Sequence, residues 1–237
     1  MIRFLFYILV CCGLILSVSC KDSHDKHIKF EIEHETKLYH QAIKFGDVGT
    51  AIHAMQSLLV WDSTKKDYYD TLALLYFHSQ NYPQAIQSAQ VILDKQPDNI
   101  KLLQIVAHSC QYLGRQDLAI PYFTKVADKQ PGPAINYEIA SCYFFARDFK
   151  KVTSYIDKIM ADKSSDTVKV NITFNQGHDQ QDVPVKAACY NLLGTLAMNV
   201  NIKDQALTNY KNALKIFPDF ELAKQNIDYI EKGDKSK

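Results

Sequence analysis

Glycine, proline and cysteine are scarce in this chain of 237 residues, which has eight, seven and six of them, and neither sign of charge is in excess. The net charge of +1 argues against a nucleic-acid partner, because proteins that bind nucleic acids usually present a strongly basic face. Fourteen Tyr and twelve Phe against so few glycines favour a helical protein whose interior is filled by aromatic side chains. With 47% hydrophobic residues, the chain is long enough for one medium-sized domain with a substantial core.

The sequence also lacks the patterns that carry common enzyme chemistry. It has no Gly-rich phosphate loop, no Gly-x-Ser-x-Gly turn and no His-Glu-x-x-His metal motif. We therefore predict that the protein is not an enzyme and holds no cofactor or metal. Four residues of metal-binding types near the N-terminus do not change this prediction, because we expect a coil there and a coil gives ligands no fixed geometry. They are Asp22, His24, Asp25 and His27.

Long apolar runs are absent except at the N-terminus, where an apolar stretch over 4–16 follows the basic Arg3. That length suits the apolar region of a secretory signal and is short for a membrane-spanning helix. The segment 17–19 comes next, followed by Cys20. This arrangement resembles a bacterial lipoprotein signal, in which a peptidase cuts before a cysteine whose sulfur carries diacylglycerol. The resemblance has one departure, since Ser17 stands where that family prefers leucine.

The lipoprotein resemblance implies a signal peptide over 1–19 and lipidation of Cys20 with fatty acyl chains such as palmitate. Several acyl chains would hold the protein on a membrane, since one chain alone binds only marginally. An uncleaved N-terminal anchor and an ordinary cleaved signal are the alternatives. The stretch 20–30 is polar and charged, so we interpret it as a flexible tether between the lipid and the folded domain.

The clearest helical pattern lies between Ala187 and Pro218, where small and aromatic residues recur at spacings of three and four. Residues with that spacing share one face of a helix. Gly194 on a first helix and Ala206 on a second would let the two backbones come close, and Tyr210 would fill the space beside them. Pro218 lacks an N–H group and ends the second helix.

The pattern Tyr-x2-Leu-Gly-x2-Ala, followed by Ala-x3-Tyr-x2-Ala-x4-Pro, resembles the tetratricopeptide repeat (TPR), a helix–turn–helix unit of 34 residues. The resemblance implies an all-α solenoid of about five helical hairpins over 31–233, closed by a capping helix at about 220–232. Equivalent positions recur at steps of 34, 34 and 33 residues and then at 54, which is 34 plus an insertion of 20. These positions are Ala51, Ala85, Ala119, Val152 and Ala206.

The repeat is interrupted over 161–186, with the insertion itself at about 164–186. Its apolar residues Val168, Val170 and Ile172 alternate with polar ones, which is the period of a half-buried strand. We predict a small β-hairpin or extended arm between the fourth and fifth helical hairpins. The arm either covers a gap in the core or acts as a lid or partner-binding strand.

The three cysteines after Cys20 fall at or beside packing positions of expected helices, and no Cys-x2-Cys spacing occurs. We predict that Cys110, Cys142 and Cys189 are small buried thiols. One disulfide is the alternative, because an envelope location permits disulfides.

A TPR solenoid presents a concave groove lined by its first helices, so the resemblance implies a binding surface there. Exposed aromatic side chains with a polar edge are common binding anchors, although these aromatics could instead belong to the core. The carboxylate clamp of chaperone-binding TPR proteins is not predicted, because Ile105 stands where that clamp needs Arg. The predicted partner-binding residues are Phe77, His78, His108, Gln111, Tyr112, Tyr137, Phe144, Phe145, Asn191 and Met198.

Together these features predict a non-catalytic, membrane-anchored TPR adaptor of the bacterial cell envelope. We expect an outer-membrane lipoprotein that faces the periplasm or the cell surface and binds a protein or peptide partner. The alternative is an accessory protein that binds a glycan or another ligand in the same groove. Polar residues around one or two aromatics would favour a sugar, whereas a long apolar channel would favour a peptide.

Overall fold

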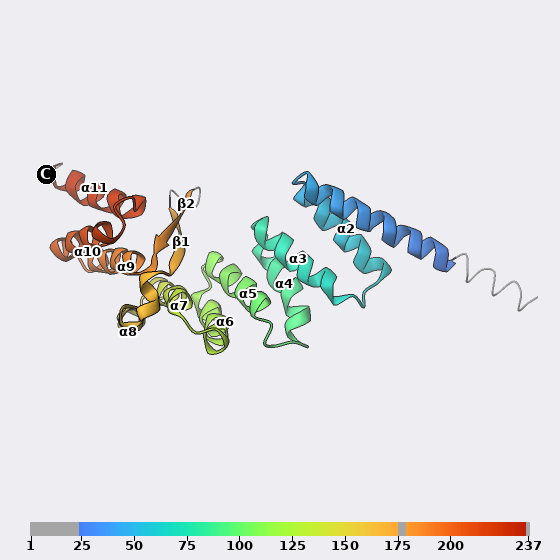
Figure 1. Ribbon diagram of the computed structural model, residues 1–237, viewed down its shortest axis with the longest axis horizontal. Coiled ribbons are helices and arrows are strands. Elements are labelled where there is room, and N and C mark those ends of the chain that lie inside the picture. The colour runs from blue at the N-terminus through green and yellow to red at the C-terminus, as the bar shows by residue number, and fades with distance from the viewer. Residues whose placement is uncertain (1–23, 175–178, 236–237) are drawn as a thin grey trace, which may run out of the picture. The chain divides into compact units, whose positions relative to one another are not determined.

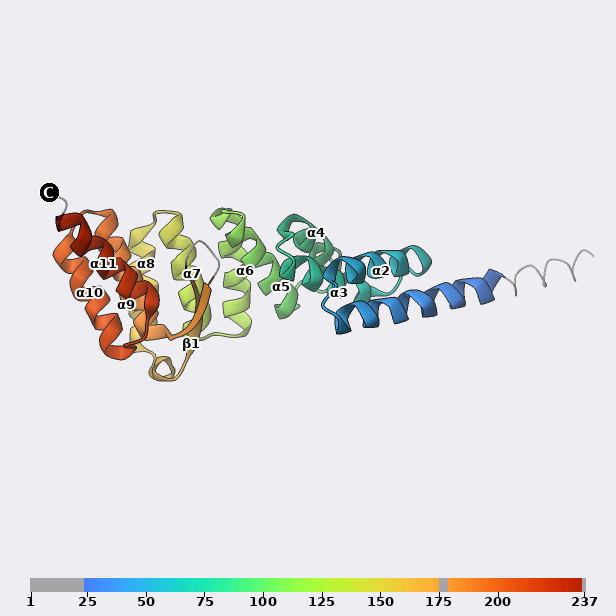
Figure 2. The same ribbon diagram turned by 90° about the horizontal axis from the view of Figure 1, so that it is seen from above.

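The computed structural model describes residues 24–174 and 179–235, as helices joined by short turns and one β-hairpin (Figures 1 and 2). The predicted signal peptide, Cys20 and the first residues of the predicted tether lie outside the described residues. The chain packs as two compact units, of which the first ends at Pro97 and the second begins at Asp98. The single domain predicted over 31–233 stays a prediction. Within the described ranges, every helix is too short or too polar to cross a membrane.

The first unit contains two helical hairpins. Residues 24–44 form a helix that runs beside α2 (Val48–Trp61), and α3 (Lys66–His78) pairs with α4 (Tyr82–Leu93) (Figure 2). Ala51 is fully buried in α2, as the repeat spacing predicted.

The first helix corrects the predicted tether, because residues 24–30 are helical rather than coil. Its side chains explain why a polar sequence forms a helix here. Lys37 and Glu33, four residues apart, form an ion pair of 2.8 Å, and His27 lies 3.8 Å from Glu31 with the same spacing. The His27 ring also packs edge-on against Trp61 of α2, with ring centroids 5.8 Å apart. The helix therefore begins before residue 31, where we predicted the start of the domain.

The second unit contains three helical hairpins, the β-hairpin and a final helix. In it, α5 packs on α6, α7 on α8 and α9 on α10, and α6 also contacts α7. The elements are α5 (Ile100–Tyr112), α6 (Gln116–Lys129), α7 (Pro133–Phe145), α8 (Phe149–Ala161), η1 (Lys163–Asp166), β1 (Lys169–Phe174), β2 (Asp179–Pro184), α9 (Val185–Asn199), α10 (Lys203–Ile216) and α11 (Glu221–Lys235).

The turns inside the helical hairpins confirm the repeat register. Each has one residue in the left-handed region, and the next N–H group returns to the carbonyl five residues earlier, as Arg115 does to Cys110 at 2.8 Å. Gly114, with φ of +72°, meets this requirement without strain. The left-handed residues are separated by 34, 34, 33 and 54 positions, the spacings predicted from the small residues. They are Gly46, Gln80, Gly114, Arg147 and Asn201.

The insertion forms the predicted hairpin, in which β1 and β2 are antiparallel and Val170 lies opposite Val183. Its apolar face is not free, since Val170, Ile172 and Val183 are buried in one cluster with Tyr137 of α7 and the first turn of α9. The hairpin therefore completes the core of the second unit, which is the first of the two roles that we considered.

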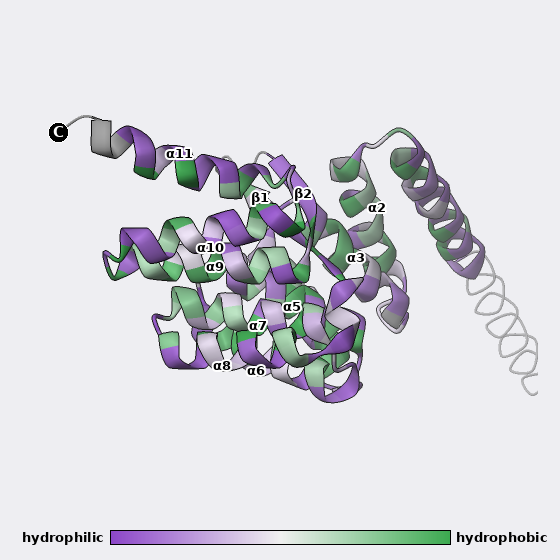
Figure 3. Ribbon diagram, turned by 60° about the vertical axis from the view of Figure 1, so that its left-hand side comes forward, coloured by the Kyte–Doolittle hydropathy of each residue, from purple (hydrophilic) through white to green (hydrophobic). Residues whose placement is uncertain are grey.

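The predicted C-terminal capping helix is confirmed as α11. Its Ala223 and Ile230 are buried, the latter beside Tyr210 of α10, while polar residues occupy much of its remaining surface (Figure 3). The hairpin is tied to the start of this helix, because the Gln181 side chain donates to the Asp219 carbonyl at 2.7 Å and accepts from the Glu221 N–H at 3.1 Å.

The cysteines also follow the prediction. Cys110, Cys142 and Cys189 are free thiols, and all three are buried in the second unit. Burial raises the pKa of Cys142 and that of Cys189 to about 12. The thiolate is the reactive form of cysteine, so these residues serve as small apolar packing groups.

Candidate functional site

The second unit holds a cavity of about 540 Å³ between helices α5 and α7 and strand β1. The end of α6 and the turn before α7 close its other sides. Most of its polar lining is uncharged, and its formally charged side chains are Glu138 and Lys169. The lining residues are Gln104, His108, Val126, Gln130, Pro131, Gly132, Pro133, Ala134, Ile135, Glu138, Ser164, Val168, Lys169, Val170 and Asn171.

The sequence places these side chains through simple periodicities. Gln104 and His108 are four residues apart on α5, as are Ala134 and Glu138 on α7, so each pair shares one helix face. Pro133 is the first residue of α7, where a missing N–H costs no helical hydrogen bond. On the strand side the wall is formed by residues of β1, whose inner side chains are held in the core.

A polar network occupies the wall formed by α5 and α7. His108 Nδ1 lies 3.3 Å from Gln111 Oε1, and the Gln111 amide makes a long contact of 3.5 Å with Glu138 Oε2. The imidazole of His108 packs edge-on against the buried ring of Phe123, with centroids 4.9 Å apart, and stacks on Tyr112 at 6.4 Å. These contacts fix the orientation of His108 and Gln111 at the cavity.

Glu138 is the most perturbed polar group of the site. It is half-buried, and burial raises the pKa of its carboxyl, while His108 and the Gln111 amide oppose that rise. Desolvation favours the neutral form of a carboxyl. A hydrogen-bond donor or a basic group that approaches Glu138 would therefore stabilise its ionised form. Chemically, the cavity can accept hydrogen bonds and hold a polar or basic side chain.

The structure brings together two of the predicted binding residues and leaves others apart. His108 lines the cavity, and Gln111 reaches it through Glu138. Tyr112 and Phe145 are 52% and 64% exposed, which fits a surface position but not the cavity. Half-buried Phe144 packs against Phe145 and Phe149, with centroids 5.4 and 6.2 Å apart.

Two predicted anchors are wrong, because Tyr137 and Asn191 are buried. Tyr137 lies under the hairpin and beside α9, and only 9% of it is exposed. Asn191 is 6% exposed and accepts a hydrogen bond of 3.0 Å from Asn226 of α11. Met198 packs into the cluster formed by α9, α10 and α11. The β-hairpin and α11 thus cover helix faces that would be exposed in a TPR hairpin without these elements.

The remaining predicted residues belong to the first unit. Phe77 is half-buried and packs edge-on against His78 and Tyr82, with both centroid distances at 5.9 Å. His78 is exposed at the end of α3. These rings form a local contact between α3 and the start of α4.

Sequence reasoning missed Glu138 and Asn171 as site residues. Glu138 is half-buried, although a carboxylate usually lies on an exposed face. The available signal was its spacing, because Glu138 follows Ala134 by four residues on the helix after a Gly-Pro turn. The alternation along the strand predicted that the Asn171 side chain points outward. Its position beside α5 depends on how the whole insertion packs and could not be predicted from the alternation.

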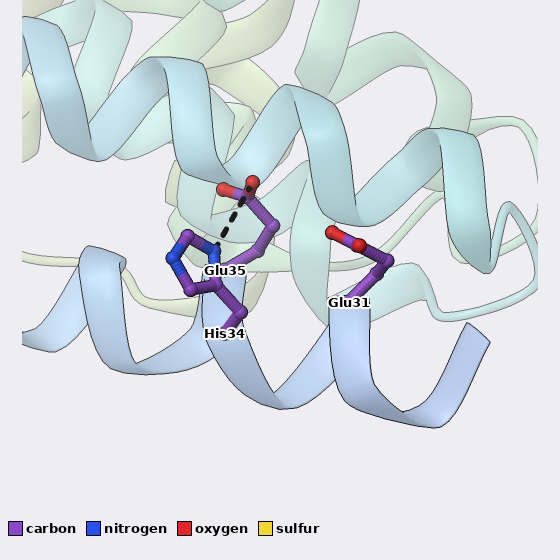
Figure 4. A group of neighbouring side chains, drawn as sticks. All are labelled: Glu31, His34 and Glu35. Carbon is purple, nitrogen blue, oxygen red and sulfur yellow. Dashed lines mark ion pairs between the residues drawn. The ribbon is translucent and has the colours of Figure 1, made fainter. Parts of the chain in front are cut away.

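The first unit also contains a compact group of metal-ligand types, Glu31, His34 and Glu35, whose ligand atoms lie within 4.8 Å of one another (Figure 4). Glu31 and Glu35 direct their carboxylates toward the neighbouring helix, whereas the His34 side chain is 58% exposed. His34 Nδ1 lies 3.7 Å from Glu35 Oε1, so these two side chains already interact with each other. All three come from adjacent turns of one helix.

Comparison with known proteins supports the fold. No protein-family model and no curated protein matches this chain. Among solved structures, MamA 41-end from Desulfovibrio magneticus RS-1 superposes with a TM-score of 0.62 at 9% identity, covering 81% of this chain and 97% of that one. YrrB, described as a TPR protein with an unusual peptide-binding site, gives 0.58 at 15% identity, covering 79% and 87%. TTC0263, a TPR protein of Thermus thermophilus, gives 0.50 at 13% identity, covering 84% and 98%. The chain therefore has the TPR fold.

Proposed function

We propose that this protein is a non-catalytic adaptor of the bacterial cell envelope, which binds a protein or peptide partner in the cavity of its second unit. The observation that carries the proposal is the cavity itself, because it opens beside the first helices α5 and α7 of two TPR hairpins and is fitted with polar side chains. YrrB, which shares this fold, is described as having a peptide-binding site, which supports the same mode of action here.

The composition of the cavity favours a peptide over a sugar. A sugar ring is commonly held on an aromatic face, yet the lining contains no Phe, Tyr or Trp. The cavity instead combines amide, imidazole and carboxylate side chains with residues of strand β1, and such groups can bind a polypeptide. The glycan-binding alternative therefore has less support than it had from the sequence.

Partner binding at the cavity is tested by filling it. A Gln104→Trp variant of the full chain is expected to retain at least fivefold less envelope protein than the wild type, because the indole occupies the space between α5 and β1. Detergent extracts of the cell envelope are passed over each immobilised variant, and retained proteins are quantified by mass spectrometry. Thr124→Trp is the matched control, since Thr124 is exposed on α6, outside the lining. Equal retention by both variants would exclude the cavity as the binding site.

The membrane anchor is the second part of the proposal and rests on Cys20 and the segment before it. A Cys20→Ala variant is expected to move from the membrane fraction to the soluble fraction, because the thiol that carries diacylglycerol is gone. Cell fractionation and labelling with a radioactive fatty acid measure this directly. Cys110→Ala is the control and should stay membrane-bound and labelled, since Cys110 is a buried thiol. Lipid labelling that persists in Cys20→Ala would refute lipidation at this residue.

A further inference from the structure

The two strands of the insertion leave two outer edges, and the register shows which main-chain groups point outward. Val185 N–H donates to the Val168 carbonyl at 2.9 Å, so these residues form a hydrogen-bonded pair. Because such pairs alternate along an antiparallel ladder, Val170 and Ile172 also bond to β2. Lys169, Asn171 and Thr173 therefore direct their N–H and C=O groups away from β2. These three residues define the outer edge of β1.

The opposite edge, on β2, carries a proline. Pro184 pairs with Lys169 and so occupies an outward position, where it has no N–H group to offer. Gln181 of the same strand pairs with Ile172 and so directs its main chain inward, while its side chain ties the strand to the start of α11. A proline on an edge strand is one of the devices by which proteins block strand addition.

The outer edge of β1 carries no proline. Among the described residues, no segment outside the hairpin forms a main-chain hydrogen bond with Lys169, Asn171 or Thr173. Lys169 and Asn171 border the cavity, and Gln104 and Glu138 stand in its helical walls. An unpaired strand edge is a template for another extended chain. Here that template lies beside a cavity large enough to take a side chain.

We propose that the outer edge of β1 pairs with an extended segment of the protein partner, which adds as a third strand of the sheet. Lys169 and Asn171 then supply four main-chain groups for the pairing, and the side chains of the added strand that face α5 and α7 enter the cavity. This inference rests on the proposed function and specifies its partner as an extended chain rather than a helix, because only an extended backbone can complete the ladder.

The test removes one outward N–H group, and a matched variant controls for the loss of the side chain. The wild type retains a protein from the extract, and full-length Asn171→Pro is expected to retain about tenfold less of it. The reason is that the edge loses the main-chain N–H group of residue 171 and the hydrogen bond that this group would donate to the added strand. The probe is the same detergent extract of the cell envelope. Asn171→Ala is the matched control, because it keeps the N–H group and loses only the side chain that bonds Asp182 at 3.0 Å, so its retention should stay within twofold of the wild type. Pro184 already occupies an outward position of this hairpin.

Amide hydrogen exchange gives a second measurement that needs no variant. In the protein alone, the amides of Lys169 and Asn171 should exchange much faster than those of Val170 and Ile172. In the retained complex, exchange at Lys169 and Asn171 should slow by about a hundredfold or more, because both N–H groups enter a ladder.

Four outcomes would overturn the inference, and they separate it from the proposed function. If Gln104→Trp abolishes retention while Asn171→Pro does not, or if the two amides stay unprotected in the complex, the partner binds the cavity without adding a strand. If neither variant reduces retention, the proposed function fails as well. If the retained protein is a second copy of this chain, the edge serves self-association and not an adaptor role.

Discussion

A Val183→Asp variant is expected to lose about 3–5 kcal/mol of unfolding free energy, because the substitution places a carboxylate in the core with no described partner. Val183 is fully buried on the inner face of β2, in a cluster with Val170, Tyr137 and the first turn of α9. The new carboxyl must either ionise in an apolar environment or hold a proton against its usual pKa, and both outcomes cost stability. Urea unfolding of the full chain measures the loss.

The matched control for this variant is Gln180→Asp, on the same strand. Gln180 is exposed and lies opposite Thr173, so its replacement should change the unfolding free energy by less than about 0.5 kcal/mol. If Val183→Asp were as harmless as Gln180→Asp, the hairpin would not be part of the core. The strand that forms one wall of the cavity would then have no fixed position.

A Gly194→Ala variant is expected to be less stable than the wild type by about 2 kcal/mol, although alanine is the better helix former. A methyl group at Gly194 would lie 2.5 Å from Cε1 and 2.6 Å from Cδ1 of Tyr210. The ring cannot easily move aside, because Tyr210 is 2% exposed and its hydroxyl donates to Thr195 at 3.3 Å. Thermal unfolding of the full chain should show a clearly lowered Tm.

The control for this prediction is Gly49→Ala. Gly49 lies in the first turn of α2, and an added Cβ there would meet only the Asp47 carboxylate at 3.7 Å, so the usual gain in helix propensity should raise stability by about 0.5–1 kcal/mol. A Gly194→Ala variant that gains stability like Gly49→Ala would contradict the close packing of α9 on α10. In a Tyr210→Leu background, Gly194→Ala should cost less stability than in the wild type, because the smaller side chain leaves room for the methyl group.

The repeat architecture could be predicted from the sequence because its determinants are local. The small residues at the second-helix positions, such as Ala85 and Ala119, are fully buried where the spacing placed them. Gly46 and Gly114 occupy two of the left-handed turn positions, and Pro218 follows the end of α10 as predicted. Each of these signals acts within one helical hairpin, so one sequence is enough to detect it.

The site could be predicted only in part, because its geometry depends on contacts between distant segments. Asn191 is covered by Asn226, which is 35 residues away, and Gln181 is held by Asp219, which is 38 residues away. Tyr137 has the position of a groove residue but is covered by the insertion. The alternation along β1 predicted which of its side chains point inward, but not that its outer edge would face α5 and α7.

The N-terminal helix was missed for a different reason, because its charged composition suggested a flexible tether. A polar composition indicates that a segment is exposed to solvent. It does not exclude a helix, because side chains four residues apart can form stabilising pairs on the helix surface. Lys37 with Glu33, and His27 with Trp61, supply the contacts that we did not infer. Of the predicted tether, residues 24–30 are helical, and the rest lies outside the described residues.

Site-specific photocrosslinking in intact cells tests the central claim most directly, because it reports what lies in the cavity without extraction. Benzoylphenylalanine replaces Gln104 in the cavity or Thr124 on the exposed face of α6, and crosslinked products are identified by mass spectrometry. Our account predicts a product with one defined segment of an envelope protein from position 104, and at least fivefold less of it from position 124. Equal yields from both positions, or no product from position 104 while position 124 reacts, would contradict it.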